Sequence, residues 1–268
     1  QATDRLTGET TPPPAAGDGG ATTHQSAGEL AEAGGARFLT DNRAGLLSGR
    51  LTGHSVAILA MPGAPAATIK GVQADITAAG GSTSRVLQAQ AQLLDPTRRQ
   101  YVDTLATQLG KQLTDRPTTV AAGVDSYQRI GQVIGATYAG KSAVKSFDEP
   151  AKTAAVALQD GGLVTAQGKP GAPADQVVVL LGPDQDAAAV KGIVQGLGAT
   201  TRGVVAAGSS SSKDLQAVRA QSLPGWLVTV DGADNATGQL ATTLAVPKAA
   251  AGDGGSFGAS GFTGLLAR

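Results

Sequence analysis

The stretch that decides the fold runs from residue 54 to residue 81 and reads HSVAILAMPGAPAATIKGVQADITAAGG. Residues 56–60 are a short, continuous apolar run, which is typical of a strand buried on both faces of a sheet. After the proline-containing turn at 61–65, apolar residues recur at helical spacing until Gly80 and Gly81 end the pattern. We therefore predict a buried strand, a turn and a helix that packs back on the sheet.

The same order of elements occurs again about 121 positions later in the chain. Residues 177–181 form the apolar run, residues 182–184 form the turn, and Gly198 closes a second apolar helix. Both helices carry the same Lys-Gly pair, Lys70-Gly71 in the first and Lys191-Gly192 in the second. This internal duplication predicts two βαβ units.

A second strand follows each of these helices, at 82–89 and at 199–207, and each carries an arginine near its start, Arg85 and Arg202. We expect an α/β fold in which the duplicated βαβ units form a mainly parallel sheet flanked by helices. Further helices are expected at 96–113, 127–138, 150–158, 213–220 and 235–244, and further strands at 163–166 and 226–230. In the helix at 96–113 the residues expected to face the sheet are Tyr101, Val102, Leu105 and Leu109.

The two ends of the chain differ in composition from its middle. Residues 1–24 contain three consecutive prolines and several glycines, which predicts a flexible tether. Residues 25–51 form an N-terminal helical segment, predicted to be an amphipathic helix broken at Gly34 and Gly35. The first α/β unit is expected at 52–166 and the second, packed with the first, at 167–248. The Gly-, Ala- and Ser-rich residues 249–268 are predicted to form a flexible tail.

Charge and composition narrow the classes of function. Basic and acidic residues number 21 each and show no run of one sign, so nucleic acid is not expected as a partner. Apolar runs are only as long as a strand, and there is no cysteine for disulfides, zinc sites or thiol nucleophiles. The sequence does not open with a signal peptide, so we expect any export segment or anchor to lie upstream of Gln1.

Soft metal ions have few possible ligands in this sequence. The imidazole and thioether side chains are His24, His54 and Met61. A copper or zinc site usually needs three or four such ligands. His24 lies in the tether, while His54 and Met61 lie at opposite ends of a strand, about 20 Å apart at 3.3 Å per residue. We therefore predict no metal ligands and interpret His54 as a surface residue.

Nucleophilic and phosphate-binding sites also lack their sequence signals. The serines at 209–212 can present hydroxyl groups at a helix start, where helix capping is the simpler role. The two Pro turns lack phosphate-loop glycines, and the second contains Asp184 and Asp186, which would repel an anion. We predict no catalytic residue and no cofactor.

One carboxylate pair, Asp231 and Asp234, follows the strand at 226–230, where α/β sheets bind ligands. A hydrolase using these two residues is an alternative hypothesis, although Asp234 is also placed to cap the next helix. Trp226 is expected to pack against a helix.

Several segments resemble an actinobacterial envelope family, MctB, together with its corynebacterial relative SteB. They are GHSVAIL at 53–59 before the first Pro turn, LLDP at 93–96, and VTVDGAD at 228–234 leading into TGQLAT at 237–242. The resemblance implies an N-terminal membrane helix, absent from this sequence, a helical stalk that can pair with a second copy, and an extracytoplasmic α/β domain. The Pro/Gly tether departs from this pattern, because a continuous coiled coil would be expected there.

Family members are linked to copper homeostasis in the envelope or, in the SteB branch, to a cytoplasmic partner called SteA that controls daughter-cell separation. Since this chain has only two separated histidines and one methionine as soft ligands, we favour a non-enzymatic scaffold or receptor at the extracytoplasmic face of the membrane, able to form a homodimer. Copper transport is the alternative.

Overall fold

The strands of the protein form one sheet in the computed structural model, which describes residues 27–113, 123–141, 146–168, 171–220 and 222–267. The strands are β1 (Ser55–Ala60), β2 (Ser82–Ala89), β3 (Val164–Gln167), β4 (Gln176–Leu180), β5 (Gly203–Ala207), β6 (Leu227–Val230) and β7 (Gly255–Phe257). Their order is β3-β2-β1-β4-β5-β6-β7. Only β3, among these seven, runs antiparallel to its neighbour, so the predicted mainly parallel α/β fold is confirmed.

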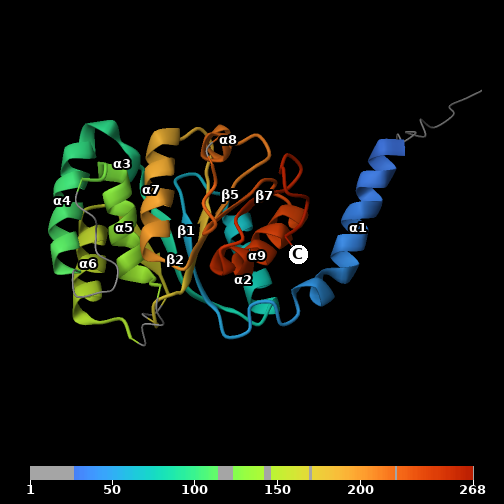
Figure 1. Ribbon diagram of the computed structural model, residues 1–268, viewed down its shortest axis with the longest axis horizontal. Helices are drawn as coiled ribbons and strands as arrows, with labels where there is room; N and C mark the ends of the chain where they lie inside the picture. Colours follow the sequence, from blue (N-terminus) through green and yellow to red (C-terminus); the bar gives the residue numbers. More distant parts are fainter. Residues whose placement is uncertain (1–26, 114–122, 142–145, 169–170, 221, 268) are drawn as a thin grey trace, which may run out of the picture.

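Helices cover both faces of this sheet (Figure 1). They are α1 (Ala27–Leu47), α2 (Ala66–Ala78), α3 (Ala91–Leu94), the short 3-10 helix η1 (Pro96–Arg98), α4 (Arg99–Gln112), α5 (Ser126–Tyr138), α6 (Glu149–Asp160), α7 (Ala187–Thr200), α8 (Lys213–Arg219) and α9 (Ala236–Ala251). Alternate side chains of the strands feed two apolar cores, as the period of a strand requires. In β1, Ala57 and Leu59 face the core under α5 and α7, while Val56 and Ile58 face the core under α2 and α9.

The two duplicated units share this one sheet, with their first strands side by side. Val56 of β1 is in register with Gln176 of β4, and Ala60 is in register with Leu180. From this central pair, β2 extends to one side and β5, β6 and β7 to the other. The strand order therefore reverses between β1 and β4.

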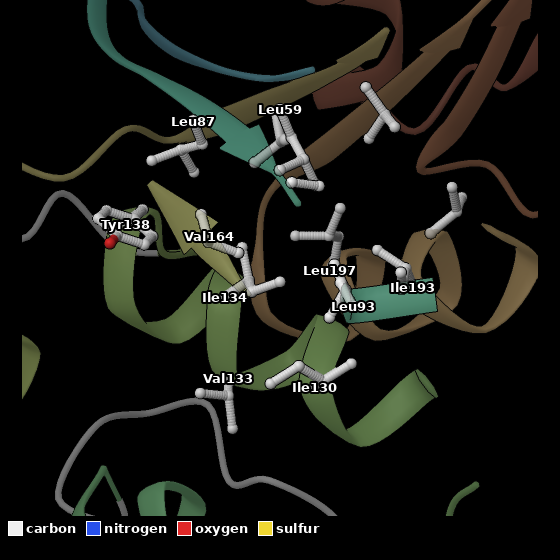
Figure 2. Packing of buried hydrophobic residues seen from close by; sticks show 14 of the residues in the cluster. Leu59, Leu87, Leu93, Ile130, Val133, Ile134, Tyr138, Val164, Ile193 and Leu197 are labelled. Atoms are coloured by element: carbon white, nitrogen blue, oxygen red, sulfur yellow. The ribbon is translucent and has the colours of Figure 1, made fainter. Parts of the chain in front are cut away.

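Glycine allows α5 and α7 to pack in close contact. A Cβ atom at Gly131 would lie 2.4 Å from the Ile193 carbonyl oxygen, and one at Gly196 would lie 2.1 Å from the Gln128 carbonyl oxygen. The glycine of the shared Lys-Gly pair has the same packing role in both units. Gly192 lies against Tyr127 of α5, and Gly71 lies against Gln239 of α9. Figure 2 shows side chains of α5 and α7 converging on the sheet beside Leu59 and Leu87.

The expected packing of α4 on the sheet is wrong. The α5–α7 layer already covers that face, so α4 lies outside it and packs mainly on α5 (Figure 1). Val102 and Leu109 are buried in this outer contact, whereas Tyr101 remains 41% exposed.

Two predicted helix breaks are also wrong. Helix α1 continues through Gly34 and Gly35, and α7 continues through Gly198 to Thr200, so that β5 starts only at Gly203. At Gly198 the missing side chain makes room for the Trp226 ring, which would lie 2.2 Å from a Cβ atom there. That glycine is thus a packing residue, and Trp226 packs on a helix as expected.

The C-terminal residues differ most from the prediction. In place of a flexible tail from 249, α9 continues past Pro247 to Ala251, and β7 pairs with β6 from Gly255 to Phe257. The small residues of this segment permit close backbone packing, as at Gly254, where a Cβ atom would lie 2.7 Å from the Pro224 carbonyl oxygen. The predicted tether at 1–24 lies outside the described residues.

Candidate functional site

The crevice where an open parallel sheet usually binds ligands is filled by the protein itself. It lies where the strand order reverses, between the turns that follow β1 and β4. Gln185 Nε2 donates to the Pro62 carbonyl oxygen at 2.7 Å, and a Cβ atom at Gly182 would lie 1.9 Å from that same oxygen. The two turns are therefore in direct contact at Pro62. Within the second turn, Asp186 caps α7 by accepting from the Ala188 and Ala189 N–H groups.

Asp231 lies at the carboxyl end of β6, as predicted, but its carboxylate is fully engaged. It is 1% exposed, pairs with Arg219 and accepts from the N–H groups of Ala259 and Ser260. Burial alone would raise the pKa of Asp231, but the hydrogen bonds from Ser260 and Arg219 outweigh it, and the pKa lies below its usual value. The Asp231 carboxylate therefore has a structural role, joining Arg219 to the C-terminal segment.

Asp234 does not join Asp231 in a carboxylate pair. Its side chain is exposed, and the residue that caps α9 is its neighbour Asn235, whose Oδ1 accepts from the Gly238 N–H at 3.0 Å. The predicted capping role of Asp234 is therefore wrong. Sequence reasoning also missed Arg219, whose position on a short helix gave no sign that it crosses to β6.

Three of the serines at 209–212, namely Ser209, Ser211 and Ser212, make contacts within their own segment. Ser212 caps α8 by accepting from the Leu215 N–H at 3.2 Å, and the Ser209 and Ser211 hydroxyl oxygens lie 3.2 Å apart. This matches the capping role that the sequence favoured over anion binding.

His54 is held at the amino end of β1 by protein groups. Its Nδ1 lies 3.0 Å from Asp175 Oδ2 and 3.2 Å from Gln176 Nε2, while the Ser55 N–H donates to the other Asp175 oxygen. Its side chain is 31% exposed, so it is half-buried and not simply a surface residue. Met61, at the other end of β1, is buried, and His24 lies outside the described residues.

Comparison with known families identifies the chain. A family model described as "Copper transport outer membrane protein, MctB" matches residues 7–265. The chain belongs to the MctB family. The resemblance seen in the strand and helix-start segments is thereby confirmed, and the description marks a transport-related protein of the cell envelope. Among curated proteins no match is found.

Among the described residues of this MctB chain, possible copper ligands are few and far apart. In the part of the chain that the structure describes, no group of three or more His, Cys, Asp or Glu side chains could hold a metal ion. A soft ion prefers thiolate, thioether or imidazole ligands. The described ligands of these kinds, His54 and Met61, are separated by the length of β1. Over the same residues, no helix has the length and apolar character needed to cross a membrane.

Proposed function

We propose that this chain is a non-enzymatic, extracytoplasmic scaffold or receptor of the cell envelope that works through protein contacts of α1. The carrying observation is the placement of this 21-residue helix. Its carboxyl end packs on the body through Leu46 and Leu47, while its amino end projects away from the sheet (Figure 1).

The outer face of α1 has the shape of a helix-packing surface. Phe38 is 64% exposed, and Gly34 and Gly45 lie on the same face, one turn before it and two turns after it. An exposed aromatic ring flanked by glycines lets a second helix approach closely on either side of the ring. Burying Phe38 would also remove apolar area from water, which favours association.

Two partners suit such a face. One is a second copy of the chain, giving a homodimer through α1. The other is a SteA-like protein reached through a membrane helix upstream of the sequence, which would connect the domain to control of cell separation. With either partner, we propose that the domain lies at the extracytoplasmic face of an actinobacterial membrane.

The test is self-association of the purified protein by sedimentation equilibrium. The wild type is expected to form dimers, and Phe38→Asp is expected to be monomeric, because a charge would be buried at the contact. Val156→Asp is the matched control, since Val156 is 58% exposed on α6, away from α1. A monomeric wild type at all concentrations, or equal loss in both variants, would overturn the role of α1.

Copper transport is the second candidate, favoured by the family match. Since the described residues of one chain offer no ligand set, copper would be held between chains or by oxygen ligands of low selectivity. Calorimetric titration of the purified protein with Cu(I) and Cu(II) is expected to show no stoichiometric site tighter than micromolar. Stoichiometric binding that weakens in His54→Ala would favour transport over the scaffold role.

A further inference from the structure

A cavity of about 580 Å³ lies between α1, the first turns of α9 and the C-terminal segment. Its volume is within the range of about 300–1,000 Å³ that is typical of small-molecule sites. It lies at the carboxyl edge of the sheet, beside Asp231 at the end of β6 and Ser210 in the loop after β5. Ligands of parallel α/β sheets bind at this edge, and the usual crevice between β1 and β4 is closed.

The cavity has an aliphatic part, formed by Leu39 and Gly35 of α1, Ala241 of α9 and Leu265 of the C-terminal segment. No aromatic ring is present among the described residues that line it. Such walls offer nothing for a planar heterocycle to stack on, but they suit a hydrocarbon chain. Leu265 is 51% exposed, so a bound chain would also cover apolar surface that now faces solvent.

Hydrogen-bond donors gather at the other part of the cavity, near the start of α9. Arg43 Nη1 donates to the Ala236 carbonyl oxygen at 2.8 Å, and Thr237 and Ser210 line the same cavity. Arg43 uses three N–H bonds for Ala236 and Asp75, out of the five that a guanidinium carries.

Asp75 balances the charge of Arg43, so an acidic head would be held by the N–H groups that Arg43 does not use for Asp75 and Ala236. Asp231, the carboxylate that lines the cavity, is already engaged by Arg219 and two backbone N–H groups. The exposed Asp234 is not part of the lining. A carboxylate is complementary to donors that include a guanidinium.

We propose that this cavity binds a single-chain fatty acid, with its hydrocarbon chain along Leu39 and Leu265 and its carboxylate toward Arg43. The proposal is independent of the α1 contact argued above, because Phe38 is not among the residues lining the cavity.

The test is titration of the purified full chain with the fluorescent fatty acid cis-parinaric acid, followed by displacement with oleate. Gly35→Trp is the blocking variant, because a Cβ atom at Gly35 meets nothing within 4 Å and the ring can extend into the cavity. Ala44→Trp is the matched control, since Ala44 is exposed on α1, does not line the cavity and lies off the face of Phe38, Gly34 and Gly45. A second pair is Leu265→Asp, at the cavity, and Phe262→Asp, which is 82% exposed and outside the lining.

We expect saturable binding of one probe per chain, weakened on the order of tenfold or more by Gly35→Trp and Leu265→Asp and changed less than about twofold by the controls. Oleate should displace the probe better than methyl oleate, which lacks the charge, and better than oleoyl lysophosphatidate, which carries a phosphate head. Equal binding by Gly35→Trp and Ala44→Trp would overturn the site. Uptake seen only with lipid vesicles would also overturn it, in favour of a membrane-surface contact. The same holds if Gly35→Trp changes the sedimenting mass and leaves probe binding intact, since a second copy would then be the occupant.

Discussion

The Arg219 guanidinium and the Asp231 carboxylate form a buried ion pair, with 2.8 Å between Nη1 and Oδ2 and side chains 5% and 1% exposed. Arg219 also donates to the Thr229 hydroxyl and to the Phe257 carbonyl oxygen. On the other side, Asp231 accepts from the N–H groups of the loop after β7. This one pair therefore connects α8, β6 and the C-terminal segment.

Asp231→Asn is expected to destabilise the protein strongly. The variant leaves the Arg219 charge buried without its partner, a change that costs about 3–5 kcal/mol in comparable pairs. Urea unfolding followed by circular dichroism measures the free energy of unfolding. Asp234→Asn is the control, since that neighbouring carboxylate is exposed and should change stability by no more than about 0.5 kcal/mol. Similar values for the two variants would refute the structural role of Asp231.

The same carboxylate should make the protein sensitive to acid. The folded-state pKa of Asp231 is lowered, so its stabilising contribution is fully present above the unfolded-state pKa of about 3.9 and is lost as the pH falls through the folded value. The effect of pH on the contribution of Asp75 to stability is opposite. Burial raises the pKa of Asp75 against the lowering effect of Arg43, so its contribution to stability is lost as the pH rises. The stability difference between wild type and Asp231→Asn isolates the first group. We expect that difference to be constant near neutral pH and to shrink below about pH 4. A difference that does not change with pH would contradict this assignment.

The sequence was sufficient for the architecture because the apolar runs and helical stripes are local patterns. The strand at 82–89 and the helix near 127–138 were predicted nearly to their ends for this reason. Glycine was harder to interpret, since Gly198 and the glycines after 252 act through close packing with distant residues. The Arg219–Asp231 pair and the cavity beside α1 also depend on which elements become neighbours in space, which no local pattern reports.

The contact between α5 and α7 should depend on its glycines. Gly196→Ala would place a Cβ atom 2.1 Å from the Gln128 carbonyl oxygen, so the helices must separate, and we expect a loss of about 1–3 kcal/mol. Gly34→Ala in α1 is the matched control, because its Cβ atom meets nothing within 4 Å. There the higher helix propensity of alanine should raise stability, or leave it unchanged where the end of α1 unfolds separately. The melting temperatures of the Gly196→Ala and Gly34→Ala variants measure this difference. A Gly196→Ala variant as stable as the wild type would show that α5 and α7 are not in such close contact.

Arg43 should determine how firmly α1 is held against the body. Its Nε donates to one oxygen of Asp75 on α2 at 2.8 Å, Nη2 pairs with the other, and Nη1 donates to Ala236 of α9, so a single side chain ties α1 to two helices. The Asp75 side chain is only 5% exposed, so solvent does not fully screen this ion pair.

The hold of Arg43 on α1 can be measured with spin labels. Because the chain has no cysteine, labels can be attached at Asp41→Cys and Ala74→Cys, two exposed positions on α1 and α2. The label-to-label distance distribution is expected to be narrow with Arg43 present and to broaden in Arg43→Met, since α1 then keeps only its apolar contacts through Leu39, Leu46 and Leu47. Lys152→Met, which breaks the exposed pair with Glu149 on α6, is the control and should leave the distribution unchanged. An equally narrow distribution in Arg43→Met would mean that the apolar base alone fixes the direction of α1.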